Sequence, residues 1–333
     1  MKLKTVLCPV DFSKVSSKEL GLASQLCQRF AARLVIQHNI DYIPPIYLAN
    51  AWMYSETHMY PEEEKEAQAE RRLQEILMKL PPSLQFEGKI TFGHLEESIL
   101  HLAQVLPADL IIMGTHGGSS PEHVSHTDRI LAQALCPILT IRDQVPETRL
   151  PVFKSEGESV QLTVLLPMDF SSHSLHALEF AFGLMEDLPV RLHLLHVEGQ
   201  IAWDDLGGIA HLNLQEKKQQ RLHHALNRLK ALIPEEFSAR VDSAVRLGAV
   251  VDEIVAHANE VEASLIIMGS HPKNILDKLL FGETSKGVLH RSPCPVWLVP
   301  TGKSSGSTKH WTHLASEQNN LLREGHGTEH FIG

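Results

Sequence analysis

The sequence contains the same set of motifs twice, in the same order. The repeated pairs are residues 6–13 and 164–171, residues 110–116 and 265–271, and residues 136–139 and 294–297. Corresponding residues lie 158, 155 and 158 positions apart in these three pairs. This period is far longer than that of a solenoid repeat, so it indicates the duplication of a whole domain.

The length and composition of the chain agree with two globular domains. The chain has 333 residues, of which 43% are hydrophobic and 21% are charged, as is usual for globular proteins. The duplication places the first domain at residues 1–142 and the second at residues 161–300. Residues 143–160 are rich in proline, glycine and charge and predict a linker. Residues 301–333 are polar and predict a loose tail.

Each copy alternates short apolar runs with amphipathic segments. The strands expected are residues 5–10, 33–40, 84–91, 110–114 and 138–142, followed by 163–168, 191–196, 239–246, 265–269 and 296–299. Residues 5–10 are continuously apolar, which is typical of a parallel strand buried on both faces. The segment after residue 61 places Leu73, Ile76, Leu77 and Leu80 on one helical face. The pattern predicts an α/β fold with two tandem, doubly wound, five-stranded parallel sheets.

Polar and glycine residues follow two of the strands in each copy. Asp11 and Asp169 follow the first strand, and Gly114 and Gly269 end the fourth. Ligands of doubly wound sheets bind at the carboxyl ends of strands where the strand order reverses. If the first and fourth strands are neighbours, the aspartate and the glycine of each copy face one crevice.

Charge and chain features exclude several classes of function. The formal net charge is −10 and no basic stretch stands out, which argues against nucleic acid as a partner. No apolar run approaches the length of about 20 residues that a membrane span requires. The chain starts directly with a strand, without a signal-peptide pattern, and its four cysteines show no CxxC spacing; both features predict a cytoplasmic protein.

Histidine is abundant, with 21 residues. His116, His123 and His126 cluster in one loop, yet no HxH or HExxH arrangement occurs. Metal ligands need convergent geometry, so we favour surface positions over a metal site. His116 and His271 follow the fourth strand of each copy and are candidates for catalysis, but no partner acid lies near them in the sequence, and a loop position is the preferred interpretation.

Taken together, these motifs resemble the universal stress protein family. The features are Pro-x-Asp-Phe-Ser after the first strand, a histidine near the end of the second strand, Ile-Ile-Met-Gly-[Ser/Thr]-His at the fourth strand, and Cys-Pro before the last strand. The resemblance covers residues 1–142 and 160–300. It implies a Rossmann-like fold of the adenine nucleotide alpha hydrolase type, in two copies.

The resemblance also implies a ligand and the residues that contact it. The ATP-binding branch of the family carries Gly-x2-Gly-x9-Gly-[Ser/Thr] after the fourth strand, where glycine amides and a helix N-terminus bind phosphates. The implied ligand is ATP or another adenine nucleotide, with Mg²⁺ as a possible companion. The implied contacts in the second copy are Asp169, Val197, Gly269, Ser270, Gly282 and Thr284. Those in the first copy are Asp11, Asn39, Gly114, Gly117 and Ser125.

Neither copy keeps the complete phosphate motif. The first copy is three residues shorter between its fourth strand and Cys136, and Val124-Ser125 replaces the final glycine pair. The second copy keeps the spacing, but Pro272 replaces a glycine and removes an amide donor. Glu283 replaces the small hydroxyl residue and would repel phosphates; Thr284, Lys273 or Lys286 could compensate. The second copy is therefore the better candidate.

Simpler interpretations of the same residues stay open. Asp11 and Asp169 also suit caps of the helices that follow them. Gly114 and Gly269 also suit a tight turn after the strand, and Ser125 also suits the cap of the last helix. Each of these roles is compatible with a position near a ligand.

Three classes of function compete at this point. The first is a stress-response regulator that binds a nucleotide in the second copy. The second is an interaction protein that uses the irregular segments 41–60 and 199–212, and the third is a slow ATPase, for which no Walker motif or placed base is visible. The last strand often mediates dimer contacts in the family. Residues 138–142 and 296–299 are therefore expected to meet as an internal pseudo-dimer, and a homodimer through these terminal strands is predicted.

Overall fold

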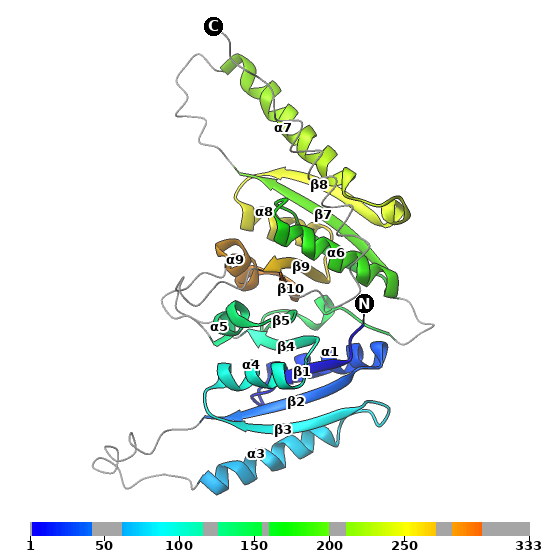
Figure 1. Cartoon of the computed structure of the whole chain (residues 1–333). Coiled ribbons are helices and arrows are strands. Elements are labelled where there is room, and N and C mark those ends of the chain that lie inside the picture. Colours follow the sequence, from blue (N-terminus) through cyan, green and yellow to red (C-terminus); the bar gives the residue numbers. More distant parts are fainter. Residues whose placement is uncertain are drawn as a thin grey trace, which may run out of the picture.

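A computed structural model describes residues 2–41, 62–115, 126–154, 160–199, 211–270 and 282–301. These residues form ten strands in one continuous sheet with the order β3-β2-β1-β4-β5-β10-β9-β6-β7-β8 (Figure 1). The strands of the first copy are β1 (Thr5–Pro9), β2 (Arg33–Ile40), β3 (Phe86–Phe92), β4 (Leu110–Thr115) and β5 (Ile138–Arg142). Those of the second copy are β6 (Leu162–Pro167), β7 (Val190–Glu198), β8 (Val241–Leu247), β9 (Leu265–Ser270) and β10 (Val296–Pro300).

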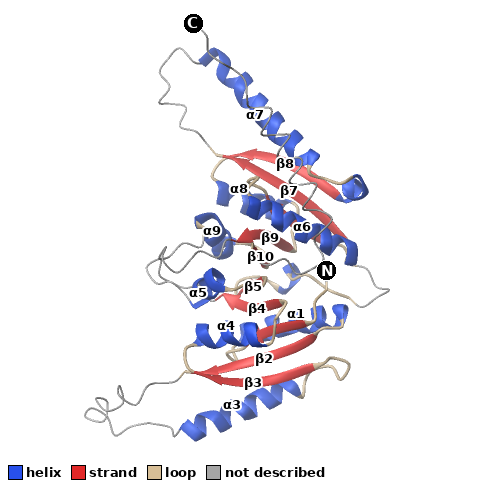
Figure 2. Ribbon diagram, in the orientation of Figure 1, coloured by secondary structure: helices blue, strands red, loops and turns tan. Residues whose placement is uncertain are grey.

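Helices cover both faces of this sheet (Figure 2). They are α1 (Lys14–Phe30), α3 (Glu62–Leu77), α4 (Leu95–Val105), α5 (His126–Gln133), α6 (Ser172–Asp187), α7 (His211–Ala231), α8 (Val250–Glu260) and α9 (Glu283–Arg291), with 3₁₀ turns at Glu147–Arg149 and Glu235–Arg240. Two hydrophobic cores result, and each extends through both copies. One core includes residues of α1, α3, α6 and α7, and the other includes residues of α4, α5, α8 and α9.

The central strands are buried on both sides, as their continuous apolar sequences predict. Val6 belongs to one core and its neighbour Leu7 to the other, and both are fully buried. On α3, Leu73 is buried and Leu77 packs against the same core. The predicted doubly wound α/β fold is confirmed, with the two five-stranded halves joined edge to edge.

The halves join through the last strand of each copy. Strands β5 and β10 are antiparallel, and Leu139 pairs with Trp297 at the centre of the contact. These two residues correspond to each other in the duplication, so a pseudo-twofold axis passes between them. Trp297 is fully buried, and its ring lies 5.1 Å from that of Phe180. The predicted internal pseudo-dimer is confirmed.

The same pairing bears on the predicted homodimer. Strand β5 lies between β4 and β10, and β10 lies between β5 and β9. Both edges of each terminal strand are therefore already paired within one chain. A homodimer through the edges of these strands is incompatible with this sheet, and any self-association would need a different surface.

Residues at corresponding positions of the two halves contact each other across the pseudo-twofold axis, and one of these contacts is an ion pair. Asp128 of α5 and Lys286 of α9 are 158 positions apart, and their Oδ2 and Nζ atoms are 3.9 Å apart. Arg29 and Asp187 are also 158 positions apart, and the guanidinium of Arg29 donates to the Asp187 carbonyl at 2.5 Å. A pair of identical copies would place like residues at these positions, so the two halves have diverged toward pairing with each other.

A charge exchange tests this complementarity. Replacing Asp128 with lysine places two ammonium groups across the axis, and we expect a loss of about 1 kcal/mol, since the pair is partly exposed. Adding Lys286→Asp to that variant should recover most of the loss. Urea denaturation of the full chain in a double-mutant cycle measures the coupling. Purely additive effects of the two substitutions would contradict the proposed pairing.

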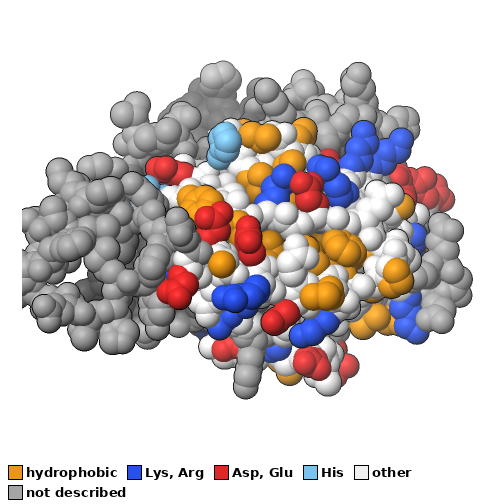
Figure 3. Space-filling view, turned by 90° about the horizontal axis from the view of Figure 1, so that it is seen from below, with side chains coloured by type: hydrophobic (Ala, Val, Ile, Leu, Met, Phe, Trp, Pro, Cys, Tyr) orange, Lys and Arg blue, Asp and Glu red, His pale blue; other side chains and the backbone are white. Residues whose placement is uncertain are grey.

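The free edge of the first half carries charged side chains. Strand β3 ends the sheet there, and its Glu87 lies 2.7 Å from Lys89 and 3.6 Å from Arg33. Viewed from below, acidic and basic side chains lie close to one another among hydrophobic ones (Figure 3). Charge on an edge strand discourages pairing with another chain.

The predicted linker is packed in its first part. Val145 and Phe153 are buried, and the Lys18 ammonium of α1 donates to the carbonyl groups of Asp143 and Val145, each at 3.0 Å. These contacts fix residues 143–154 against the first half. Among the described residues, none of the helices is both long and apolar enough to cross a membrane.

Candidate functional site

The turn after the first strand has the same structure in both copies. Asp169 Oδ1 accepts hydrogen bonds from the backbone N–H (3.0 Å) and the hydroxyl (2.6 Å) of Ser171. Asp11 Oδ1 accepts from the Ser13 N–H (2.8 Å) and the Ser16 hydroxyl (2.6 Å). The helix caps themselves are Ser13 and Ser171. The aspartates therefore hold the capping serines rather than cap the helices.

These contacts affect the ionisation of Asp169. Partial burial acts to raise the pKa of its carboxyl group, but hydrogen bonds from Ser171 and Ser174 outweigh burial and lower the pKa. A carboxylate that accepts several hydrogen bonds is stabilised in its charged form. Asp169 is thus a fixed negative charge at the end of β6.

A phenylalanine in the left-handed backbone region follows each aspartate. The φ angles are 62° at Phe12 and 60° at Phe170, which is uncommon for a bulky residue. An arginine and a histidine flank each ring, and these neighbours hold the turn in place. The Arg228 guanidinium lies 3.9 Å from the centre of the Phe170 ring, and His196 Nδ1 donates to the Met168 carbonyl at 2.7 Å.

The first copy repeats this arrangement around Phe12. Arg72 lies over the ring at 5.7 Å, and His38 Nδ1 donates to the Val10 carbonyl at 2.8 Å. Sequence reasoning identified the histidine position but missed the phenylalanine and the arginine. The Asp-Phe-Ser motif in both copies was the available signal, since a residue in this backbone region needs neighbours that fix it.

The second copy contains a cavity of about 600 Å³ at the carboxyl ends of β6 and β9. Its size is in the range of small-molecule sites. Its wall includes all six residues predicted for this copy: Asp169, Val197, Gly269, Ser270, Gly282 and Thr284. Strands β6 and β9 are direct neighbours, with Val164 paired to Leu265, so residues 100 positions apart in the sequence share one wall.

Other elements complete the wall of this cavity. Val250 and Ile254 of α8 supply apolar surface, and His173 and Ser174 come from the first turn of α6. Sequence reasoning missed these four residues. Val250 and Ile254 are spaced by one helical turn, which is the pattern of a helix that presents one apolar face.

The two predicted glycines of the second copy have different structural roles. A Cβ atom on Gly269 would lie 2.2 Å from the His173 carbonyl oxygen, so this glycine permits the close approach of α6 to β9. A Cβ atom on Gly282 would meet no atom of the described residues within 4 Å. Gly282 is the N-cap of α9 and borders the cavity, so the helix N-terminus adjoins the space for a ligand.

The charges on the cavity wall are negative. Among the described residues that line it, Asp169 and Glu283 are carboxylates, and none is a lysine or an arginine. Lys286, which could have compensated for Glu283, instead has its ammonium 3.9 Å from Asp128 of the first copy. The hydroxyls of Ser171, Ser270, Thr284 and Ser285 supply neutral donors and acceptors.

The first copy provides a different environment for its predicted residues. The side-chain amide of Asn39 donates to the Gly93 carbonyl at 2.8 Å and accepts from the Thr91 hydroxyl at 3.0 Å. The Gly114 carbonyl accepts from the Thr127 hydroxyl at 3.5 Å. Gly117 and Ser125 lie outside the described residues, as do His116, His123 and His271.

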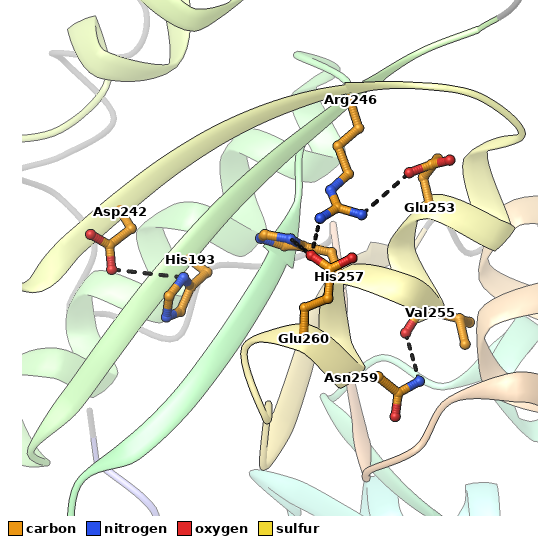
Figure 4. Close-up of polar contacts among 8 residues, drawn as sticks. All are labelled: His193, Asp242, Arg246, Glu253, Val255, His257, Asn259 and Glu260. Carbon is orange, nitrogen blue, oxygen red and sulfur yellow. Dashed lines mark hydrogen bonds and ion pairs between the residues drawn. The ribbon is translucent and has the colours of Figure 1, made fainter.

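A second group of titratable residues lies between β7, β8 and α8 (Figure 4). The rings of His193 and His257 are 6.2 Å apart, and His257 is 8% exposed, with its Nδ1 3.7 Å from a carboxylate oxygen of Glu260. Arg246 pairs with Glu253 and Glu260 beside them. The corresponding residues of the first copy, Val35 and Leu102, are apolar and buried.

Both histidines are held in the neutral form. Burial lowers the pKa of His193, and Arg191 lowers it further, while Asp242 opposes this effect. Burial and then the Arg246 charge lower the pKa of His257, while Glu260 raises it. Within the described residues, no group of three potential ligands is placed to hold a metal ion.

This arrangement predicts that acid destabilises the second half. A histidine whose pKa is lower in the folded state contributes stability above its unfolded pKa of about 6.5. That stability is lost as the pH falls below this value, because the unfolded chain takes up more protons. His257→Leu, which copies Leu102 of the first half, should flatten the fall in the free energy of unfolding between about pH 7 and pH 5.

Urea denaturation across this pH range makes the measurement. His223→Gln, at an exposed position on α7, serves as the control and should keep the slope of the unsubstituted protein. An unchanged slope in the His257→Leu protein would show that this residue does not carry the acid sensitivity.

The fold and the crevice define a class of protein. The chain is a tandem, doubly wound α/β protein with a small-molecule-sized cavity where the strand order of its second half reverses. The sequence profile of the universal stress protein family matches residues 2–142 and 162–300. The chain belongs to this family and contains two of its domains.

Individual relatives agree with this assignment. Universal stress protein MJ0531 of Methanocaldococcus jannaschii is 26% identical over 148 residues, which cover 44% of this chain and 86% of that protein. Universal stress protein MJ0577 of the same organism is 30% identical over 150 residues, covering 41% and 93%. The crystal structure of a universal stress protein from Archaeoglobus fulgidus has a TM-score of 0.63 at 21% identity, covering 91% of this chain and all of that one.

Proposed function

We propose that the protein is a stress-response regulator whose second half binds an adenine nucleotide or a closely related adenine compound. The observation that carries the proposal is the convergence of six residues, selected from the sequence, on one cavity at the ends of β6 and β9. Binding at this position is the general behaviour of doubly wound sheets.

The chemistry of the wall suits a nucleoside. The Asp169 carboxylate is an acceptor for ribose hydroxyls, and the backbone at Val197 offers groups for the edge of adenine. Val250 and Ile254 provide an apolar surface for the base. The N-terminus of α9, beginning after Gly282, offers amide donors at the far end of the cavity.

Mg²⁺ fits the same arrangement as an optional companion. Carboxylate oxygens are its usual protein ligands, and it keeps several waters when it accompanies a nucleotide. Asp169 and Glu283 are the two carboxylates of the wall. Titrations with and without Mg²⁺ therefore belong to the same experiment.

Calorimetric titration of the full chain with adenosine, AMP, ADP and ATP tests the proposal. At least one of these should bind the unsubstituted protein. Val250→Trp should abolish that binding, because the side chain at position 250 is 38% exposed at the cavity wall and a tryptophan there would fill space that the ligand needs. Leu95→Trp, at the corresponding position of the first half, is the matched control and should bind as before. No binding by any of the four compounds, with or without Mg²⁺, would refute the proposal.

The alternative function is that of an interaction protein that has the same fold but binds no nucleotide. The segments considered for protein interaction, 41–60 and 199–212, lie almost entirely outside the described residues. Mass spectrometry of small molecules released from the purified, denatured protein distinguishes the two functions. A bound adenine compound supports the proposed function, and its absence together with a failed titration supports the interaction protein.

A further inference from the structure

The electrostatics of the second-half cavity restrict what kind of adenine compound it accepts. Sites for polyphosphates combine backbone amides with lysine or arginine side chains, because three or four negative charges must be balanced. The described wall of this cavity has two carboxylates and no lysine or arginine. Its charge therefore opposes each phosphate that a ligand adds.

Glu283 is the carboxylate of the wall that would repel the phosphates of a ligand most strongly. It lies in the first turn of α9, directly after the N-cap Gly282, and it borders the cavity. An anionic ligand at the helix N-terminus would meet this carboxylate within the same turn. The negative charge of Glu283 already complements the helix dipole in this turn.

Among the described residues, no other charge near the cavity reverses this effect, and Lys273 lies outside the described residues. Asp169 lies on the turn after β6, and hydrogen bonds from Ser171 hold it in its ionised form. Lys286 of α9 lies beside Asp128 of the other half.

We propose that this cavity selects adenine compounds of low charge, binding adenosine or its monophosphate in preference to ADP and ATP. The inference rests on the proposed function and specifies its ligand. The ribose hydroxyls have an acceptor in the Asp169 carboxylate, and the serine and threonine hydroxyls of the wall offer partners to the remaining polar atoms of a nucleoside. Repulsion between a carboxylate and a phosphate a few ångströms away is worth roughly a tenfold change in affinity or more.

The test compares affinities across the phosphate series with the full-length protein. Without Mg²⁺, the affinity for adenosine should be at least about tenfold higher than the affinity for ATP, and the affinities for AMP and ADP should lie between these two. Glu283→Ser should raise the affinity for ATP by roughly tenfold and leave the affinity for adenosine within about twofold. Glu216→Ser, at an exposed position on α7, is the control. It should leave unchanged both the order of the four affinities and the ratio between the affinities for adenosine and ATP.

Salt dependence gives a second readout that folding defects would not imitate. Because the interaction is repulsive, added salt should screen it and increase the affinity for ATP, whereas adenosine should respond little. ATP or Mg²⁺–ATP binding as tightly as adenosine, or ATP binding that weakens with salt, would overturn the inference while leaving the proposed function in place. Failure of every compound to bind would instead overturn the proposed function.

Discussion

Replacing Gly269 with alanine is expected to destabilise the second half by about 3 kcal/mol or more, as overpacking against rigid backbone does. The added methyl group would lie 2.2 Å from the His173 carbonyl oxygen and 2.4 Å from the His173 carbonyl carbon. Neither atom can move unless the first turn of α6 shifts away from β9. Because both elements line the cavity, the substitution should also weaken ligand binding.

Gly183→Ala is the matched control for this substitution. Gly183 lies within α6, and a Cβ atom there would meet no atom of the described residues within 4 Å. Alanine in a helix interior is more favourable than glycine by roughly 0.5–1 kcal/mol, so this variant should be slightly more stable. Urea denaturation of both variants makes the comparison, and a Gly269→Ala protein as stable as the unsubstituted chain would contradict the proposed steric role.

Glu19 is expected to make the first half less stable as the pH rises. This carboxyl group is 3% exposed on α1, and burial together with the nearby charge of Asp11 raises its pKa to about 8. A carboxyl group whose pKa is higher in the folded state than in the unfolded state favours folding at low pH. Its contribution is fully present below about pH 4.5 and is lost as the pH rises through 8.

The size of this effect is on the order of 5 kcal/mol between these limits, since one pKa unit corresponds to about 1.4 kcal/mol. Glu19→Gln keeps the volume of the side chain and removes its ionisation, so it should flatten the loss of stability between about pH 5 and pH 9. Glu19→Ala copies the corresponding residue of the second half, Ala177, and should flatten it as well.

Urea denaturation at several pH values measures both variants. Cys8 and Cys27 are the other titratable groups packed here, and burial is the main cause that raises the pKa of each thiol. The two thiols therefore stay protonated over the range in which Glu19 titrates. A Gln variant that keeps the pH dependence of the unsubstituted chain would show that Glu19 does not titrate in this way.

The fold was largely predictable from the sequence. Two copies of each motif established the number of domains, and continuous apolar runs such as residues 5–10 identified strands buried on both faces. Strand ends could be placed because parallel strands share one edge, so Asp169 and Gly269 were expected in one crevice before any coordinates. The contact of β5 with β10 was expected from the resemblance to a family whose last strand often mediates dimer contacts, and its antiparallel direction came from the structure.

The details of the site depend on contacts that no local pattern encodes. Gly269 was expected to serve a turn or a phosphate, but its close approach to His173 is a property of how α6 packs on β9. The left-handed backbone of Phe170 depends on Arg228 and His196, which come from other elements.

Differences between the two copies were equally hidden. Glu19 and His257 stand in buried positions where the other copy has Ala177 and Leu102. Each lies on a helix whose sequence is otherwise amphipathic, so a polar residue there is indistinguishable from one on the solvent face until packing is known. Burial therefore had to come from the structure.

Photoaffinity labelling with 2-azidoadenosine, followed by peptide mapping of the full-length protein, tests the central claim most directly. The account predicts labelled peptides from the wall of the second-half cavity, which is formed by residues 167–174, 195–197, 250–254, 268–270 and 282–285, and predicts that unlabelled adenosine prevents the labelling. Labelling that competes with adenosine but maps to the first half, or to surfaces away from β6 and β9, would contradict it.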